Sequence, residues 1–366
     1  HCKDNLDQQY RQLQTGIDSA ILKVLNHGQY ILGPEVQQLE QTLASFVGVD
    51  HCIAMSSGTT ALEIALQAIG VKSGDEIITT AFSFFSTAEV IARMGAIPVM
   101  VDVNPLTYNM DEHLIEAVIT EKTKAIMPVS LYGQPANYTA INAIAEKYQL
   151  PVIEDGAQSF GSTHHGKRSC GLTTIGCTSF FPSKPLGCYG DGGACFTNDA
   201  SLAETMRCLI NHGQYERYVH EMMGCNGRLD TIQAAVLLEK IKIFEREVAQ
   251  RQQVAAWYAQ SLPDEMVKPH ILSENASVFG QYTIQVSDRD LFRRSLNDAG
   301  IPTAVHYPKG MHQQPAMTTY ACSAQSCPHA EKAAQSVVSL PFYPSMSQSE
   351  VSQVVGVIKS NILQGV

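Results

Sequence analysis

The chain has 366 residues, of which 45% are hydrophobic and 16% charged, as expected of a well-packed globular protein with more than one domain. Its formal charge of −10 argues against nucleic acid as the main partner, because no overall basic field exists to neutralise phosphates. No apolar run approaches the roughly 18–20 residues that a membrane span requires, so we expect no membrane association.

The first residues and the cysteines both favour a cytoplasmic protein. The N-terminal sequence lacks the apolar core of a signal peptide, and it lacks an initial methionine, which suggests a processing or cloning remnant. The ten cysteines include no C-x-x-C pair. We therefore expect free thiols in a reducing cytoplasm, and no metal site.

The chain opens with two expected helices, residues 16–27 and 35–46, and Pro34 suits the first position of the second helix. From about residue 50, short apolar runs alternate with helical patterns. The expected strands are residues 51–55, 76–79, 98–101, 125–129 and 151–154. The expected helices between them are residues 61–69, 87–94, 112–119 and 136–148.

This alternation predicts an α/β fold with a parallel or mostly parallel sheet and helices on both faces. Residues 178–181 and 193–197 extend the sheet without a full helix between them, so an antiparallel strand is expected there. Residues 232–262 form one or two helices leading out of the large domain. The remainder mixes a strand at 281–286 with helices at 291–299 and 351–362. We expect a large domain, residues 1–245, and a smaller C-terminal α+β domain, residues 246–366.

A cluster of serine, threonine and glycine follows the first expected strand and opens a helix. Gly58 would let the backbone approach an anion, and the amide of Thr59 and the positive end of the helix dipole would point toward that anion. The same cluster also fits a simple helix N-cap. It is not a P-loop, because no G-K-[ST] sequence follows.

An aspartate and a lysine follow two expected strands. Asp155 stands at the carboxyl end of its strand, the edge at which open α/β sheets bind ligands. Lys184 follows the apolar Phe180 and Phe181, and partial desolvation would lower its pKa from about 10.4. Pyridoxal phosphate (PLP) requires such a pair, the lysine for its aldehyde and the carboxylate for its ring nitrogen. The alternatives are a helix N-cap for Asp155 and a surface loop for Lys184.

Three more residues fit a PLP site. Gln158 stands three residues after Asp155 and could reach the phenolic oxygen of the ring. Ser179, five residues before Lys184, is a candidate phosphate ligand. Phe84 could stack on the cofactor ring or pack in the core, and residue type does not separate the two.

Taken together, these motifs resemble the DegT/DnrJ/StrS family of PLP-dependent nucleotide-sugar aminotransferases, whose fold is the fold-type I architecture. The resemblance is collinear over nearly the whole chain, and the motifs are specific only in combination. They are Gly33-Pro34-Glu35-Val36, Ser57-Gly58-Thr59-Thr60-Ala61-Leu62, Val101-Asp102-Val103 with Tyr108-Asn109, Glu154-Asp155-Gly156-Ala157-Gln158-Ser159, the segment 179–184, Gly190-Asp191-Gly192-Gly193, Asn226-Gly227-Arg228-Leu229-Asp230, His306-Tyr307-Pro308 and Gln314-Pro315-Ala316.

The resemblance implies a role for each matched residue. Lys184 would bind the cofactor covalently and transfer protons. The other residues implied to bind PLP are Gly58, Thr59 and Ser179 at the phosphate, Phe84 on the ring face, Asp155 at the ring nitrogen and Gln158 near the phenolic oxygen. Asn226 would reach the phosphate in the partner subunit, which implies a homodimer with shared active sites. The implied substrate residues are Arg228, for an anionic group, with Tyr30, His306 and Tyr307.

The resemblance also implies the reaction, in which glutamate donates an amino group to a keto-sugar nucleotide for surface polysaccharide synthesis. One branch of the family has histidine in place of the lysine, and Lys184 therefore favours transamination. The subgroup acting on UDP-2-acetamido-2-deoxy-3-oxo-glucuronate is the most similar, on residues 179–193 and 304–308. The alternatives are a 4-keto-6-deoxy sugar as acceptor, and a PLP-binding regulator without turnover. Loss of Lys184 or Asp155, or an added DNA-binding domain, would indicate the regulator.

Overall fold

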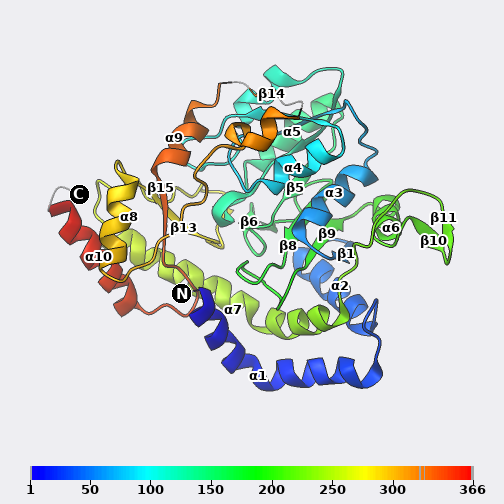
Figure 1. Ribbon diagram of the computed structural model, residues 1–366, viewed down its shortest axis with the longest axis horizontal. Coiled ribbons are helices and arrows are strands. Elements are labelled where there is room, and N and C mark those ends of the chain that lie inside the picture. Colours follow the sequence, from blue (N-terminus) through cyan, green and yellow to red (C-terminus); the bar gives the residue numbers. More distant parts are fainter. Residues whose placement is uncertain (1, 321–322, 325, 364–366) are drawn as a thin grey trace.

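A computed structural model describes residues 2–320, 323–324 and 326–363 of the chain (Figure 1). Its central sheet is mostly parallel, as predicted. The strand order is β1 (His51–Met55), β9 (Gly193–Thr197), β8 (Ile175–Ser179), β5 (Ile153–Asp155), β4 (Thr123–Met127), β2 (Glu76–Thr80), β3 (Ile97–Val101) and β14 (Ser323–Ala324), with single bridges joining the segments of β5 and β4. Strand β9 runs antiparallel to both neighbours, which confirms the expected reversed strand.

Helices cover both faces of this sheet, as the alternating side chains of β1 show. Ile53 and Met55 pack against α3, α4 and α6, whereas Cys52 and Ala54 pack against α2 and α7. The helices around the sheet are α1 (Cys2–His27), α2 (Pro34–Val47), α3 (Gly58–Ala68), α4 (Ser86–Arg93), α5 (Tyr138–Tyr148), α6 (Ala200–Leu209) and α7 (Thr231–Ser261). Pro34 occupies the start of α2, as predicted.

The helix expected at residues 112–119 is wrong. The structure has two short 3₁₀ turns there, η1 (Glu112–Leu114) and η2 (Glu116–Val118). Asp111 accepts a hydrogen bond from the amide of His113 and starts the first turn. Ile115 is the one fully buried side chain of the segment, and one anchor cannot offset the entropy of ordering an α-helix of this length.

The C-terminal part has its own small core. Strands β13 (Tyr282–Gln285) and β15 (Val337–Leu340) pair antiparallel and pack with α8 (Arg289–Asp298), α10 (Gln348–Leu363) and the C-terminal half of α7. Helix α7 is a single helix that runs from beside α2 to beside α10 (Figure 1). It passes continuously through residue 245, so the division into two domains at that position stays a prediction.

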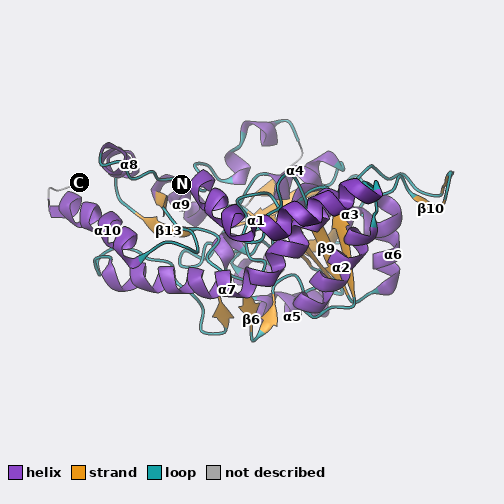
Figure 2. Ribbon diagram, turned by 90° about the horizontal axis from the view of Figure 1, so that it is seen from below, coloured by secondary structure: helices purple, strands orange, loops and turns teal. Residues whose placement is uncertain are grey.

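Helix α1 is longer than predicted and packs along α7. A hairpin of β10 (Gln214–Glu216) and β11 (Val219–His220) projects from the end of the molecule far from α8 and α10 (Figures 1 and 2). The remaining short elements are β6 (Thr163–His164), β7 (Lys167–Arg168), β12 (Asn275–Ala276), α9 (Pro328–Ser336), η3 (Leu131–Gly133), η4 (Met311–Gln313) and η5 (Pro315–Thr318).

Two further expectations concern membrane-spanning helices and the cysteines. Within the residues that the structure describes, no helix is both long and apolar enough to cross a membrane. Seven cysteines of the described part are free thiols: Cys52, Cys170, Cys177, Cys188, Cys195, Cys208 and Cys225. Cys322 and the side chain of Cys2 lie outside the described residues.

Candidate active site

Asp155 is a buried carboxylate at the carboxyl edge of the sheet, where it ends β5. Its Oδ2 accepts a hydrogen bond from the Thr87 hydroxyl at 2.7 Å, and its Oδ1 accepts one from the Ala157 amide at 3.2 Å. Burial raises the pKa of Asp155 despite these donors. No helix follows Asp155, so the N-cap alternative does not apply. These hydrogen bonds fix the side chain in place. A protonated partner that enters the site would favour the ionised form of Asp155.

Lys184 stands in the turn after β8, the strand that pairs in parallel with β5. Its backbone amide donates to the Phe181 carbonyl at 2.8 Å, which tightens the turn. Burial lowers the pKa of Lys184, and the charge of Asp155 acts in the opposite direction. Lys184 is half-buried in this turn and borders a cavity, which disfavours the surface-loop alternative. The structure brings together the lysine and the aspartate that the sequence singled out, and burial favours the neutral, nucleophilic amine.

The candidate phosphate residues meet where α3 begins. A Cβ atom added to Gly58 would lie 2.7 Å from the Cβ of Ser179, so only glycine permits this approach. Ser57 caps the helix by accepting a hydrogen bond from the Thr60 amide at 3.0 Å. The cap leaves the amides of Gly58 and Thr59, in the first helical turn, for a ligand. The start of α3 therefore has both features, the N-cap from Ser57 and the two amides that could bind an anion.

Gln158 and Tyr307 connect the sheet edge to the C-terminal part. The Gln158 Oε1 accepts from the Tyr132 amide at 3.0 Å, and its Nε2 donates to the Tyr307 hydroxyl at 3.1 Å. Burial raises the pKa of Tyr307, as does the charge of Asp155, so the phenol stays protonated. The ring of Tyr307 lies 6.0 Å from that of Phe84.

Phe84 is 54% exposed, which excludes the alternative that it packs in the core. His306 lies beside the same centre. Its Nδ1 is 2.8 Å from the Ser339 hydroxyl, and its carbonyl accepts a hydrogen bond from the Tyr132 hydroxyl. Burial lowers the pKa of His306, and the charge of Lys184 adds to this effect. His306 therefore favours its neutral form next to the lysine.

Three predicted residues lie away from Lys184 within one chain. Asn226 and Tyr30 are exposed, and Arg228 donates from Nη1 to the Asn211 Oδ1 at 2.6 Å while its Nε has no partner. Arg228 lines a cavity of about 900 Å³ whose walls do not include Lys184. The loop of Asn226 touches the phosphate cradle through its neighbour, because the Ser56 amide donates to the Gly227 carbonyl at 2.8 Å.

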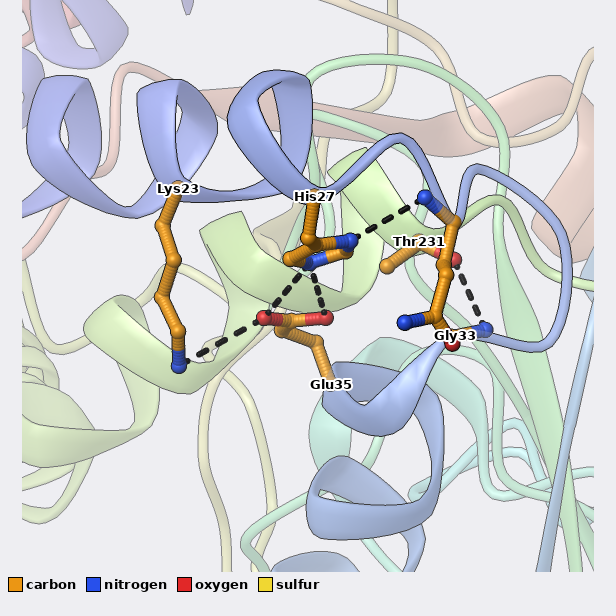
Figure 3. A network of polar contacts seen from close by, with 6 residues as sticks. Lys23, His27, Gly33, Glu35 and Thr231 are labelled. Carbon is orange, nitrogen blue, oxygen red and sulfur yellow. Dashed lines mark hydrogen bonds and ion pairs between the residues drawn. The ribbon is translucent and has the colours of Figure 1, made fainter.

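A polar network holds the turn that presents Tyr30 (Figure 3). Both carboxylate oxygens of Glu35 lie 3.2 Å from the His27 Nε2, and the Gln29 amide donates to the His27 Nδ1 at 3.0 Å. At the other end of the turn, the Gly33 amide donates to the Thr231 hydroxyl at 3.0 Å. The turn is fixed on both sides, and Tyr30 points out from it.

Sequence reasoning missed two residues that support the site, Thr87 and Tyr132. Thr87 is 68 residues from Asp155 along the chain, and Tyr132 is 26 residues from Gln158. Thr87 opens a helix directly after a strand, at the same sheet edge as Asp155, and that position was the signal that could have found it. Tyr132 sits in an irregular turn with a φ of 56°, which no sequence pattern indicated.

Comparison with known proteins identifies the family. The profile of the DegT/DnrJ/EryC1/StrS aminotransferase family matches residues 12–359. The chain belongs to this family. It is 53% identical to UDP-2-acetamido-2-deoxy-3-oxo-D-glucuronate aminotransferase of Pseudomonas aeruginosa, over 95% of this chain and 96% of that protein.

Solved structures of the family have the same fold. A DegT DnrJ EryC1 StrS aminotransferase from Brucella abortus has a TM-score of 0.95 at 41% identity, over 98% of both chains. NtdA from Bacillus subtilis, solved with bound cofactor PMP, has a TM-score of 0.88 at 33% identity, over 95% of this chain and 82% of that one. The chain is therefore a PLP-dependent sugar aminotransferase with the fold-type I architecture.

The residues present fit PLP, which supplies an electron sink at the substrate carbon when bound. The Gly58 cradle admits a phosphate where a larger residue would clash with Ser179, and the exposed ring of Phe84 offers a stacking surface. Asp155 would hold the ring nitrogen, and Gln158 already carries two hydrogen bonds that fix its amide. Lys184 is positioned to hold and move the proton between carbon atoms.

Proposed function

We propose that this enzyme transfers the amino group of glutamate to the 3-keto group of UDP-2-acetamido-2-deoxy-3-oxo-glucuronate, in surface polysaccharide synthesis. The observation that carries transamination is the juxtaposition of Lys184 with Asp155 at the edge of the sheet. The acceptor is supported by the 53% identity to the Pseudomonas aeruginosa enzyme over nearly the full length of both chains. A regulator without turnover would not need to keep this pair, and the juxtaposition disfavours that alternative.

Each residue around Lys184 has a separate role in the proposed reaction. In each half-reaction, Lys184 would move a proton between the substrate-derived carbon and the cofactor carbon, accepting it from one and donating it to the other. Asp155, oriented by Thr87, would pair with a protonated ring nitrogen in both half-reactions. Tyr307 and His306 would line the sugar-nucleotide pocket beside Lys184.

We further propose a homodimer in which Asn226 reaches the cofactor phosphate of the second copy. The support is an exposed surface around this residue. Its hairpin β10–β11 carries Tyr218 and Val219 on the outside, and Met223 in the following loop is 91% exposed. Arg228 and Tyr30 would complete the substrate pocket of the second copy, since neither contacts Lys184 in its own chain. Such apolar exposure favours burial in an interface.

Two other assignments remain proposals. The seven free thiols named above support a reducing compartment, and we propose the cytoplasm. We also propose two domains, residues 1–245 and 246–366, supported by the separate core that β13, β15, α8 and α10 build.

The test follows the absorbance of the bound cofactor in two stages. PLP-loaded protein should lose its yellow colour with glutamate, and it should regain the colour when a keto-sugar nucleotide accepts the amino group. We expect faster recovery with UDP-2-acetamido-2-deoxy-3-oxo-glucuronate than with a 4-keto-6-deoxy UDP-sugar. The Lys184→Ala variant is the control and should turn over neither. A higher kcat/KM for the 4-keto compound would overturn the acceptor assignment, and bleaching by aspartate alone would overturn the donor.

A further inference from the structure

Three charged side chains lie along one face of helix α7, and one of them contacts the loop that follows Lys184. Lys240, Glu247 and Arg251 are all buried there. Lys240 donates from Nζ to the Gly187 carbonyl at 2.7 Å, in the loop that follows Lys184. Burial lowers the pKa of Lys240 to about 8 and that of Arg251 to about 10, and the charge of Glu247 opposes both shifts. Buried charges are costly unless they are paired, so a negative group of a ligand would be favoured beside these cations.

Arg251 is the cation that has a hydrogen-bond donor without a partner. Its side chain is 6% exposed, its Nη1 donates to the Phe279 carbonyl at 3.2 Å, and its Nε has no hydrogen-bond partner. No ion pair joins Arg251 to a carboxylate in the part of the chain that the structure describes. Glu247 attracts Arg251 but takes its hydrogen bond from the Gln9 amide group at 2.8 Å. A guanidinium with a free donor is suited to a carboxylate.

Arg251 borders a cavity that also reaches Lys184. The cavity has a volume of about 490 Å³, and its walls include Lys184, His306, Arg251 and Gln281. This volume is within the range of about 300–1,000 Å³ that is typical of small-molecule sites. One wall thus carries the reacting amine, and another carries the guanidinium of Arg251.

We propose that Arg251 binds a carboxylate of a substrate in this cavity, an inference that rests on the proposed function for the identity of that substrate. Two substrates of the reaction carry carboxylates, the dicarboxylic amino donor and the uronic acid sugar. Each carries that carboxylate in the same molecule as its reacting carbon, from which Lys184 takes a proton in the donor and to which it gives one in the sugar. The chemistry that Arg251 recognises is the same in both cases, and the ligands of the test separate the two sources.

The test measures binding by calorimetry to the PLP-loaded protein. Glutarate is the probe for the donor, because it has both carboxylates and no amine. UDP-glucuronate and UDP-glucose are the probes for the sugar, because they differ only in the carboxylate at C6. The variants are Arg251→Gln and Arg251→Lys. The matched control is Arg289→Gln, because Arg289 also donates to a backbone carbonyl, that of Ala334, but lies outside this cavity.

We expect Arg251→Gln to weaken either glutarate or UDP-glucuronate by about 10-fold or more, the loss typical of a hydrogen bond to a charged group. Binding of UDP-glucose should stay the same, Arg251→Lys should recover part of the affinity, and Arg289→Gln should match the wild type. Loss with glutarate identifies the donor, and loss with UDP-glucuronate identifies the sugar.

Three results would overturn the proposal. Unchanged affinity for both carboxylates is the first, and an equal loss with UDP-glucose, which indicates a general packing defect, is the second. The third is a wild type that binds neither glutarate nor UDP-glucuronate in preference to UDP-glucose. If Arg251→Gln fails to fold, the same comparison is made with Arg251→Lys, whose unchanged affinities would also overturn it. Turnover with keto-sugars tests the proposed function separately, because the enzyme can transfer the amino group even if Arg251 binds no substrate carboxylate.

Discussion

Asp155 is oriented from inside the protein before any ligand reaches it. Thr87 donates to one of its oxygens and Ala157 to the other, so the carboxylate cannot rotate away from the sheet edge. Preorganised groups of this kind stabilise developing charge without reorganisation during the reaction. The role of Asp155 should therefore appear in both half-reactions, because the ring nitrogen serves both.

Asp155→Asn should keep the fold and slow both half-reactions by about 100-fold or more, the scale found for preorganised electrostatic groups. Stopped-flow absorbance with glutamate, and then with the keto-sugar, measures each half separately. The matched variant Thr87→Val removes one hydrogen-bond donor but keeps the carboxylate. It should slow both half-reactions by about 10-fold. Slowing of one half-reaction alone would contradict the assigned role.

Glu154, next to Asp155, is a buried carboxylate that the reaction does not use. Its Oε1 accepts from the hydroxyls of Ser130 at 3.0 Å and Ser169 at 2.6 Å, and its Oε2 accepts from the Cys170 amide at 2.7 Å. Burial nevertheless raises the pKa of Glu154 to about 7. The folded state therefore holds a proton that the unfolded state has lost, and the stability from this proton is lost as the pH rises through 7.

Glu154→Gln, which cannot titrate, should gain stability relative to the wild type as the pH rises. Between about pH 5.5 and pH 8.5 the difference should change by about 2 kcal/mol, in favour of the variant. Urea denaturation of both proteins at several pH values gives this difference, and other titrating groups cancel in it. If the two stability curves stay parallel over this interval, the proton is not on Glu154.

At the scale of elements, the connection between α1 and α2 depends on one carboxylate. Glu35 is buried at the start of α2, and His27, the last residue of α1, meets both of its oxygens (Figure 3). Burial alone would raise the pKa of Glu35, but its own backbone amide and His27 lower it below its usual value. The exposed turn with Tyr30 is thus held by the contact of the buried Glu35 with the half-buried His27, whereas Lys23 adds an outer ion pair at 3.6 Å.

His27→Ala should destabilise the protein by about 1–3 kcal/mol, because it leaves a buried carboxylate short of donors. The control Lys23→Ala removes an exposed partner of the same carboxylate and should cost no more than about 1 kcal/mol. Urea denaturation measures both, and hydrogen exchange should show faster opening of residues 28–33 in His27→Ala alone. Equal costs for the two variants would show that the histidine has no special part in the turn.

At the scale of the whole molecule, the predicted site residues do not all lie together within one chain. Lys184, Asp155 and Phe84 lie together, whereas Asn226 is exposed beside the start of α3 and Arg228 lines a cavity whose walls do not include Lys184. If a second copy supplies them, each site is built from two chains. Two different inactive variants should then complement each other.

Mixing Lys184→Ala subunits with Asn226→Ala subunits should restore activity that neither has alone. A mixed dimer contains one site with both lesions and one with neither, so up to about half of the sites in mixed dimers regain full activity. Turnover is measured after subunit exchange has been verified by differently tagged chains. Absence of rescue in verified mixed dimers would mean that each site is built within one chain.

The sequence by itself determined the chemistry of the site and most of the elements. Asp155 and Lys184 were predictable because each follows a strand, and the carboxyl ends of parallel strands share one edge. Gly58 was predictable because a glycine at a helix start fits close approach of an anion. The helix at 112–119 was wrong, because its local pattern did not reveal that a single side chain, Ile115, would be buried.

Only the tertiary structure decided which distant residues support these groups. Thr87 reaches Asp155 because β2 and β5 lie on either side of β4, and this strand order depends on long-range packing. Arg251 borders the cavity of Lys184 because α7 runs on from its contact with α2 to its contact with α10. Local sequence encodes propensity and side-chain chemistry, whereas burial and the balance of charges emerge only when segments far apart in the chain pack together.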